Sequence, residues 1–341
     1  MQVTTVPGMQ RIAVIGAGSW GTALASLAAK SVPTSLWARR PELADAINKT
    51  GENPDYMSGH TLPDRLEATS DLGDAVDSAE TVIMAVPSHG FREVFTQVAA
   101  HIDPATPVVS LTKGIEQDSL QTMTQVIKST APAHDFARTG VLTGPNLASE
   151  IIAGQPTAAV IAMPDQSAAE KIQDALMGPS FRVYTNDDVI GCELGGAMKN
   201  VMALAAGMSD GLGFGDNTRA ALITRALAEL TRLGVKLGGR PATFAGLAGM
   251  GDLIATCSSH LSRNHRVGVG LAEGKALDRI IEEMNMVAEG VKTTKAVLGL
   301  AVRAGVEMPI AGHVGRVLYE GLAPRDAVLS LMTREAKDER E

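Results

Sequence analysis

Three glycines near the start of the chain have the spacing of a phosphate-binding loop. In the stretch RIAVIGAGSWG, residues 11–21, Gly16, Gly18 and Gly21 follow a strand-like run and precede the helix-forming run WGTALASLAAK. In this order of elements Gly16 permits a tight turn, Gly18 lets the backbone approach a pyrophosphate, and Gly21 lets the helix pack on the strand. The helix N-terminus then attracts the phosphates. The stretch predicts a dinucleotide site; the alternative is a glycine turn without a ligand.

Two arginines stand where a protein that binds NAD would carry a carboxylate. Arg39 and Arg40 follow the expected strand TSLWA. An acidic side chain at this position binds the ribose hydroxyls of NAD, whereas arginine binds the 2′-phosphate of NADP through charge-assisted hydrogen bonds. The pair predicts NADP(H) as the preferred cofactor and NAD(H) as the second. Two solvated arginines in front of a helix are the alternative.

Two lysines and an amide are expected at one crevice, since ligands of open α/β sheets lie beyond the carboxyl ends of the strands. Lys113, Gly144 and Asn146 each follow such an end. Lys199 lies in a helical run, residues 193–208, whose apolar residues have the spacing of one buried stripe. Small residues one turn away leave room for another helix or a ligand at its amine. Lys199 is thus a candidate proton donor to a carbonyl, and a surface lysine is the alternative.

A basic segment in the second half of the chain is suited to a phosphate. Glycines at 246, 249 and 251 are expected to break the helical pattern around Asp252. The run SRNHR then supplies a compact set of donors, which are Ser262, Arg263, Asn264, His265 and Arg266. The alternative is an ordinary polar helix start with Ser262 as N-cap.

The elements that must position these residues change in character along the chain. Short β-rich runs alternate with helical patterns up to about residue 188, which is typical of a parallel sheet, and residues 189–335 have helical patterns alone. We expect an α/β protein with an N-terminal Rossmann-type, mostly parallel sheet domain, residues 1–189, and an all-α C-terminal domain, residues 190–341. The expected strands are 11–15, 34–38, 81–86, 107–111, 140–142, 158–162 and 181–184.

Composition excludes several classes of protein. A formal charge of −8 argues against a nucleic-acid surface, which needs clustered Lys and Arg. The two cysteines, Cys192 and Cys257, form neither a disulfide framework nor a metal-ligand pattern, so no metal is expected. The first residues lack the pattern of a secretory signal, and no run has the roughly 18 apolar residues of a membrane helix. We expect a cytoplasmic protein that is not integral to a membrane.

Taken together, these residues resemble the NAD(P)H-dependent glycerol-3-phosphate dehydrogenases of the bacterial biosynthetic type. The resemblance runs in the family's order from near the start of the chain to about residue 293. It is carried by the segments GAGSWGTALA, AVPSHG, LTKGIE, TGPNLASEI, ELGGAMKNVMALAAG, GMGDLIATC, SRNHRVG and VAEGVKT. Many relatives have Ser and Phe where this chain reads Gly-Pro-Asn-Leu-Ala, so packing around Leu147 is expected to differ.

The resemblance implies reversible reduction of dihydroxyacetone phosphate to sn-glycerol 3-phosphate, a precursor of glycerophospholipids. It implies Lys199 as the catalytic proton donor. The implied substrate-binding residues are Lys113, Gly144, Asn146, Lys199, Asp252, Ser262, Arg263 and Asn264. The expected cofactor-binding residues combine those of the glycine loop and the arginine pair with those that the resemblance implies. They are Gly16, Gly18, Ser19, Trp20, Gly21, Arg39, Arg40, Lys113, Ala148, Arg263, Val287 and Glu289. Gly/Ala-rich faces in the helical half indicate a homodimer.

Two other functions compete with this interpretation. A dehydrogenase of a β-hydroxyacid or of a ketoacid such as ketopantoate would share the glycine loop and Lys199, but it would not predict the segments around Asp252 and Ser262. A non-catalytic NADP sensor would keep the loop and Arg39 without needing either lysine.

Overall fold

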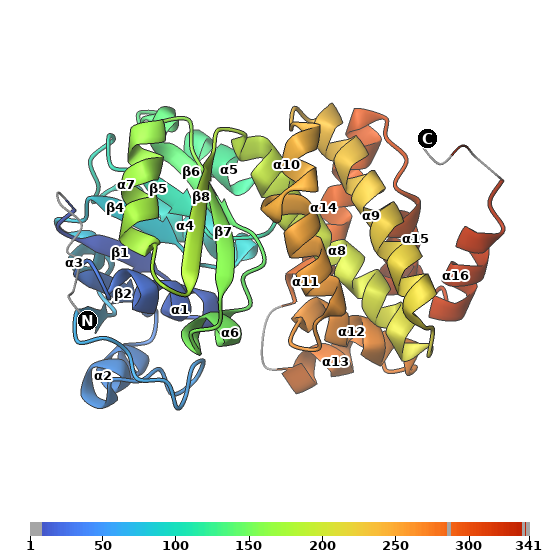
Figure 1. Ribbon diagram of the computed structural model, residues 1–341, viewed down its shortest axis with the longest axis horizontal. Coiled ribbons are helices and arrows are strands. Elements are labelled where there is room, and N and C mark those ends of the chain that lie inside the picture. The colour runs from blue at the N-terminus through green and yellow to red at the C-terminus, as the bar shows by residue number, and fades with distance from the viewer. Residues whose placement is uncertain (1–8, 285–287, 336–337, 339–341) are drawn as a thin grey trace.

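The computed structural model describes residues 9–284, 288–335 and 338, which form a sheet domain followed by a bundle of helices (Figure 1). One sheet of eight strands lies within these residues, in the order β3-β2-β1-β4-β5-β6-β7-β8. The strands are β1 Ile12–Ile15, β2 Thr34–Trp37, β3 Leu66–Thr69, β4 Thr81–Met84, β5 Val108–Ser110, β6 Thr139–Thr143, β7 Thr157–Ala162 and β8 Phe181–Asn186.

Seven strands are those predicted from the sequence, to within two residues at each end. Sequence reasoning missed β3, whose four residues LEAT include only one buried side chain, Ala68. A short edge strand with one buried position leaves almost no apolar pattern to detect. The expectation of a mostly parallel sheet is confirmed, because every pair is parallel except β6 with β7.

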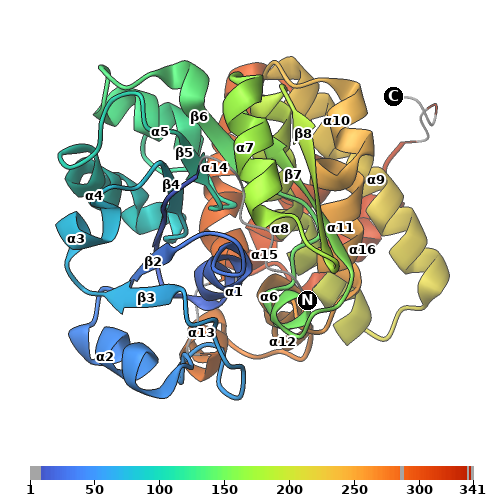
Figure 2. The ribbon, with the colours of Figure 1, turned by 60° about the vertical axis from the view of Figure 1, so that its left-hand side comes forward.

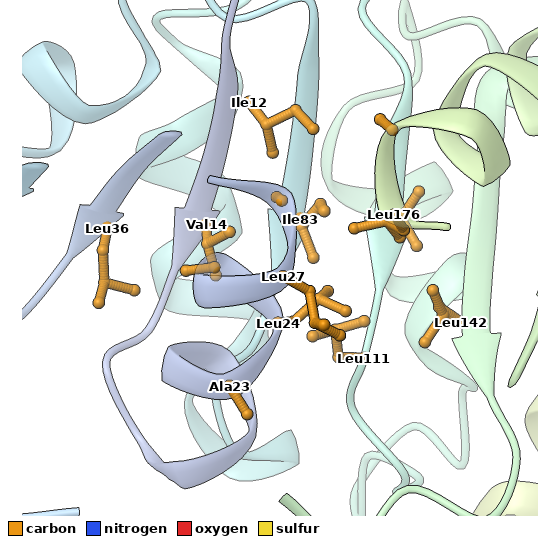
Figure 3. Close-up of a cluster of buried hydrophobic side chains, with 14 of the residues drawn as sticks. Ile12, Val14, Ala23, Leu24, Leu27, Leu36, Ile83, Leu111, Leu142 and Leu176 are labelled. Carbon is orange, nitrogen blue, oxygen red and sulfur yellow. The ribbon is translucent and has the colours of Figure 1, made fainter. Parts of the chain in front are cut away.

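Helices cover both faces of the sheet, as Figure 2 shows. Side chains alternate along each strand, so Ile12 and Val14 pack toward α1 and α7, while Ala13 and Ile15 pack toward α3, α4 and α5. Figure 3 shows the first of these clusters, in which leucines of α1 meet side chains of the strands. The helices of this domain are α1 Ser19–Ala28, α2 Pro41–Thr50, α3 Leu72–Val76, α4 Ser88–Ala99, α5 Met123–Thr130, the 3₁₀ turn η1 Phe136–Arg138, α6 Ala148–Ile152 and α7 Gln166–Leu176.

The second half of the chain is helical throughout the residues that the structure describes, as predicted. Its elements are α8 Val189–Gly211, α9 Asp216–Lys236, α10 Pro241–Ala245, the π-helix η2 Leu247–Gly251, α11 Asp252–Ser258, α12 Arg263–Ala272, α13 Leu277–Met284, α14 Glu289–Ala304, α15 Pro309–Glu320 and α16 Pro324–Met332. Figure 1 shows α8 running from the sheet domain into this bundle, where α9, α11, α12 and α14 pack around it.

Helix α8 is buried on nearly all sides, so the expectation of a single buried stripe is wrong. Neighbouring helices surround it, and polar side chains such as Lys199 and Asn200 are buried along with the apolar ones. By length and composition α8 alone, among the described helices, could cross a membrane. Because 83% of its most apolar window is buried inside the protein, it has the character of a core helix.

The start of α8 is fixed by Asp188. Its Oδ1 accepts a hydrogen bond from Gly191 N at 2.9 Å, which caps the helix, and its Oδ2 accepts from Thr243 Oγ1 at 2.6 Å. One carboxylate thus ties the helix start to α10. The domain boundary expected near residue 189 falls between the end of β8 and this helix, and it stays a prediction.

Candidate active site

The glycine loop lies at the carboxyl end of β1, where the strand order reverses between β2 and β4. Gly16 has φ +124°, and a Cβ there would lie 2.7 Å from the Ala85 carbonyl oxygen, so only glycine fits without strain. Helix α1 begins at Ser19 directly after the loop. The indole Nε1 of Trp20 is buried without a hydrogen-bond partner within the described part of the chain. An open helix terminus beside an unpaired donor fits a phosphate-containing ligand.

Arg39 and Arg40 follow β2 and are both exposed. Arg40 is the N-cap residue of α2 and pairs with Asp55 of the loop that follows this helix. The two arginines therefore differ, because the guanidinium of Arg40 already has a carboxylate partner. The expected contact of each with a 2′-phosphate stays a prediction.

A buried carboxylate brings together the two lysines that the sequence placed far apart. Asp252, which is 1% exposed, begins α11 and accepts hydrogen bonds from both ammonium groups. Lys113 Nζ lies 2.6 Å from Asp252 Oδ2, and Lys199 Nζ lies 2.9 Å from Asp252 Oδ1. Burial acts to raise the pKa of this carboxyl, but the two ammonium groups outweigh burial and hold the pKa below its usual value. Charged side chains from the loop after β5, from α8 and from α11 thus converge at one point.

The ammonium group of Lys113 has a pKa well below its usual value. Burial lowers the pKa of its ammonium group to about 8, with Lys199 acting in the same direction and Asp252 opposing both. Its Nζ also donates to the Gly144 carbonyl at 2.8 Å, which connects β5 to the end of β6. Lys113 therefore changes charge close to the pH at which most enzymes work, as groups at functional sites often do.

Thr256 belongs to the same cluster and was missed by the sequence reasoning. Its hydroxyl accepts a hydrogen bond from Lys199 Nζ at 2.6 Å and donates to Asp252 Oδ1 at 3.3 Å. Thr256 lies four residues after Asp252 on α11, so both side chains are on one face of that helix. That spacing in the run GDLIATC is the signal that could have identified it.

The break in the helical pattern expected before Asp252 occurs at Gly246 alone, whose extended backbone separates α10 from η2, whereas Gly249 and Gly251 lie within a helix. Residues 247–251 form the π-helix η2, which continues directly into α11. A wide turn of this kind often marks a functional site. Gly195 of α8 allows its approach, because a Cβ there would lie 2.6 Å from the Ala248 carbonyl oxygen. The small residues next to Lys199 thus make room for a protein segment that carries Asp252.

Asn146 lies two residues beyond Gly144, in the loop after β6. Both Nδ2 and Oδ1 of its side chain are buried, and neither has a partner within the described residues. Leaving a buried amide unpaired costs free energy, so this group is expected to pair with an ordered water molecule or a ligand. Leu147 is the N-cap residue of α6, and Ala148 is the first residue of this helix, on the same loop.

The basic segment lies at the start of α12. Ser262 is its N-cap residue, with Oγ accepting from His265 N at 3.3 Å, as the alternative reading of this segment anticipated. Arg263 is the first residue of the helix and is exposed. Asn264 is engaged by the protein: Nδ2 donates to Asn200 Oδ1, and Oδ1 accepts from Gly290 N, both at 2.9 Å.

Asn200 extends this amide chain into the sheet domain, because its Nδ2 donates to the Lys113 carbonyl at 2.9 Å. Both polar atoms of Asn200 thus serve protein contacts. The amide pair of Asn200 and Asn264 fixes α8, α12 and the start of α14 relative to the loop that carries Lys113. Within the part of the chain that the structure describes, the second N–H of Asn264 has no acceptor.

Glu289, the first residue of α14, reaches across to the sheet domain. Its carboxylate accepts from Ser88 N at 3.0 Å and from Ser88 Oγ at 2.6 Å, at the start of α4. The negative charge therefore lies at a helix N-terminus, where it is stabilised. Val287, the other cofactor contact expected in this segment, lies outside the described residues. No group of three His, Cys, Asp or Glu side chains within the described chain could hold a metal ion.

Comparisons with known proteins agree on one family. The model described as the N-terminus of NAD-dependent glycerol-3-phosphate dehydrogenase matches residues 11–169, and the model of its C-terminus matches residues 188–329. The glycerol-3-phosphate dehydrogenase [NAD(P)+] 2 of Sphingopyxis alaskensis is 51% identical over 96% of this chain and 98% of that protein. Its counterpart from Anaeromyxobacter dehalogenans is 50% identical, with 96% and 99% covered.

Solved structures separate this family from its neighbours in fold. The crystal structure of glycerol-3-phosphate dehydrogenase from Coxiella burnetii has a TM-score of 0.91 at 39% identity, covering 96% of this chain and all of that one. The competing dehydrogenases are represented by a ketopantoate reductase from Ralstonia eutropha. Its structure has a TM-score of 0.56 at 15% identity and covers 94% of this chain and all of its own. This likeness shows a shared fold alone. The chain belongs to the NAD-dependent glycerol-3-phosphate dehydrogenase family.

Proposed function

We propose that the protein reduces dihydroxyacetone phosphate to sn-glycerol 3-phosphate with NADPH, and with NADH as the second cofactor, and catalyses the reverse reaction. The observation that carries this proposal is the carboxylate of Asp252 held between the ammonium groups of Lys113 and Lys199. The family to which the chain belongs supports the substrate and the type of reaction.

The residues around the glycine loop fit a nicotinamide dinucleotide. The positive φ of Gly16, the open start of α1 and the unpaired indole nitrogen of Trp20 all favour a bound pyrophosphate. When bound, the cofactor supplies the hydride that reduces the carbonyl carbon. In this proposal Ser19 and Trp20 hold its phosphates, Arg39 and Arg40 its 2′-phosphate, and Ala148, Arg263, Val287 and Glu289 complete its site.

Lys199 is the proposed proton donor to the carbonyl oxygen. Among the described residues, two of its three N–H groups have partners, one on Asp252 Oδ1 and one on Thr256 Oγ1, and in this proposal the third binds the substrate. A donor fixed by two hydrogen bonds in a site with little access to water is well oriented for proton transfer. The two lysines and Asp252 together carry one net positive charge, which stabilises the negative charge that develops on the oxygen.

The substrate phosphate is proposed to bind at the start of α12. Arg263 supplies a guanidinium, and the helix N-terminus supplies N–H groups and a partial positive charge. Ser262 donates through its hydroxyl hydrogen, and Asn264 through its remaining N–H. In this proposal Lys113, Gly144 and Asn146, whose buried amide lacks a partner within the described residues, bind the hydroxyl and carbonyl groups of the substrate.

An absorbance assay tests the proposal. We expect oxidation of NADPH, followed at the nicotinamide band, when dihydroxyacetone phosphate is added, and slower oxidation of NADH at equal low concentration. Ketopantoate in the same assay represents the competing dehydrogenases. Absence of oxidation with dihydroxyacetone phosphate and either cofactor, or turnover of ketopantoate alone, would overturn the proposal. A protein that binds NADPH without any turnover would instead be a sensor.

We further propose that the protein works in the cytoplasm as a homodimer and supplies glycerol 3-phosphate for glycerophospholipid synthesis. Exposed apolar side chains on α14 and α16, including Val302 and Met332, support an interface between helical domains. Light scattering of the purified protein tests the dimer; a monomer mass at micromolar concentration would contradict it.

A further inference from the structure

Asn53 connects the glycine loop to a distant segment of the chain. It lies in the loop between α2 and β3, and its side chain is fully buried, at 0% exposure. Its Nδ2 donates to the Ala17 carbonyl at 3.0 Å and to Thr22 Oγ1 at 2.8 Å. Its Oδ1 accepts from Asp55 N and Tyr56 N, both at 3.3 Å. The amide of Asn53 therefore donates to the glycine loop and to helix α1, and it accepts from its own loop.

The hydrogen bond to Ala17 determines where the glycine loop directs its donors. In a planar trans peptide the C=O and N–H point in opposite directions, so holding the Ala17 carbonyl fixes the direction of the Gly18 N–H. Thr22 reinforces this arrangement, because its hydroxyl donates to the same carbonyl at 3.3 Å. Ala17 lies between two glycines, whose backbone loses much freedom when it is ordered. The hydrogen bond from Asn53 restricts the backbone of the glycine loop before a ligand binds.

The loop that carries Asn53 is itself fixed by hydrogen bonds and by burial. Asn53 O accepts from Met57 N at 2.9 Å, and Gly51 O accepts from Leu62 N at 2.7 Å, so residues 51–62 form a closed loop. Met57 and Leu62 are buried in the hydrophobic cluster that includes α1. The amide of Asn53 is therefore fixed relative to the start of the helix that follows the glycine loop.

We propose that Asn53 is a positioning residue for the dinucleotide, which holds the Ala17–Gly18 peptide in the orientation that receives the pyrophosphate. The inference rests on the proposed function, in which the glycine loop binds NADPH or NADH. Asn53 acts on the pyrophosphate that both cofactors share and leaves the distinction between them unchanged.

The variant Asn53→Asp tests this inference. It keeps the shape of the side chain and the acceptor for Asp55 N and Tyr56 N, but it replaces the donor to Ala17 with a carboxylate oxygen. We expect the dissociation constants of NADPH and NADH, measured by calorimetry, to rise together by about 10- to 100-fold. The inhibition constant of adenosine 2′-monophosphate, which lacks a pyrophosphate, is expected to stay within about twofold, because its binding does not use this peptide.

Asn48→Asp is the matched control. Asn48 Nδ2 donates to Ala68 O at 2.7 Å, and its Oδ1 accepts from Ala68 N at 2.8 Å, so its amide joins α2 to β3 without touching the glycine loop. An equal loss of NADPH binding in this control, or an equal weakening of adenosine 2′-monophosphate in Asn53→Asp, would overturn the inference. So would NADPH binding by Asn53→Asp within twofold of the wild type.

A second variant covers the case in which a buried carboxylate prevents folding. Thr22→Val removes the hydroxyl that bonds both Asn53 and Ala17 while keeping the side-chain shape. We expect its NADPH dissociation constant to rise about 3- to 10-fold; an unchanged constant would overturn the inference. Wild-type protein that fails to bind NADPH would refute the proposed function instead, so the two failures are distinguishable.

Discussion

The carboxylate oxygen Oδ1 of Asp252 lies 2.9 Å from the ammonium nitrogen of Lys199, and both side chains are almost completely buried. Charges that are removed from water are costly unless they are paired. Here two lysines share one carboxylate, so the three described side chains together carry one net positive charge. A buried cation with one unused N–H is suited to an oxygen that gains negative charge during a reaction.

Replacing Lys199 with Ala should lower kcat for reduction by roughly 10² to 10⁴, because the proposed proton donor is removed. The dissociation constant of NADPH should change little, since the glycine loop is untouched. Stopped-flow and steady-state assays at the nicotinamide band measure both quantities. Lys171→Ala, on the exposed side of α7, is the control and should be fully active. Near-native turnover of Lys199→Ala would refute the assignment.

Activity should decline at alkaline pH as Lys113 loses its proton. The pKa of this group is about 8, so the fraction of charged Lys113 is high below that pH and falls as the pH rises through it. We expect kcat/KM for dihydroxyacetone phosphate to fall above pH 8. In Lys113→Arg the side chain stays charged at alkaline pH. The decline of kcat/KM should therefore move to higher pH, even if the variant is slower than the wild type. An unchanged profile in this variant would assign the decline to another group.

Replacing Asp252 with Asn should shift the same decline in the other direction. Asp252 raises the pKa of Lys113, against the effects of burial and of Lys199. An amide of the same shape removes this opposing charge and leaves two buried ammonium groups side by side. We expect kcat/KM to fall by at least about 10² and its alkaline decline to begin below pH 8. A pH profile of the variant that matches the wild type would contradict this account of the cluster.

Sequence patterns predicted the elements of this site better than their contacts. The strand ends, the glycine loop and the lysines could be predicted, because each depends on local periodicity or on a rule for parallel sheets. The bridge between Lys113 and Lys199 could not, because it joins residues of different domains through Asp252. Asn53 gave no signal at all, since a polar residue in a loop has the same appearance whether it is solvated or buried.

Cofactor preference should depend more on Arg39 than on Arg40. Asp55 pairs with Arg40 and competes with a 2′-phosphate for its guanidinium. We expect Arg39→Ser to weaken NADPH binding by about 10- to 100-fold and NADH binding by less than about threefold, as measured by calorimetry. Asp55→Asn should tighten NADPH binding and leave NADH unchanged. Equal effects on the two cofactors in either variant would exclude a role in recognition of the 2′-phosphate.

The stability of the helical domain should depend on the protonation of Glu229. This buried residue of α9 accepts hydrogen bonds from Ile310 N at 2.7 Å and Ala311 N at 3.4 Å, at the start of α15. Burial raises the pKa of its carboxyl from 4.5 to about 7, although both backbone donors oppose that shift. Between these two values the folded protein binds more protons than the unfolded chain. The contribution of Glu229 to the free energy of unfolding therefore falls as the pH rises from 4.5 to 7.

Glu229→Gln removes this titration while its carbonyl oxygen can still accept from Ile310 N. Relative to the wild type, the free energy of unfolding of the variant should rise by about 2 to 3 kcal/mol between pH 5 and pH 8, as measured by urea denaturation. Glu93→Gln, at an exposed position of α4, should show no such change and serves as the control. If the difference between Glu229→Gln and the wild type is the same at both pH values, the carboxylate remains charged throughout. The two backbone donors of α15 would then outweigh the cost of burying it.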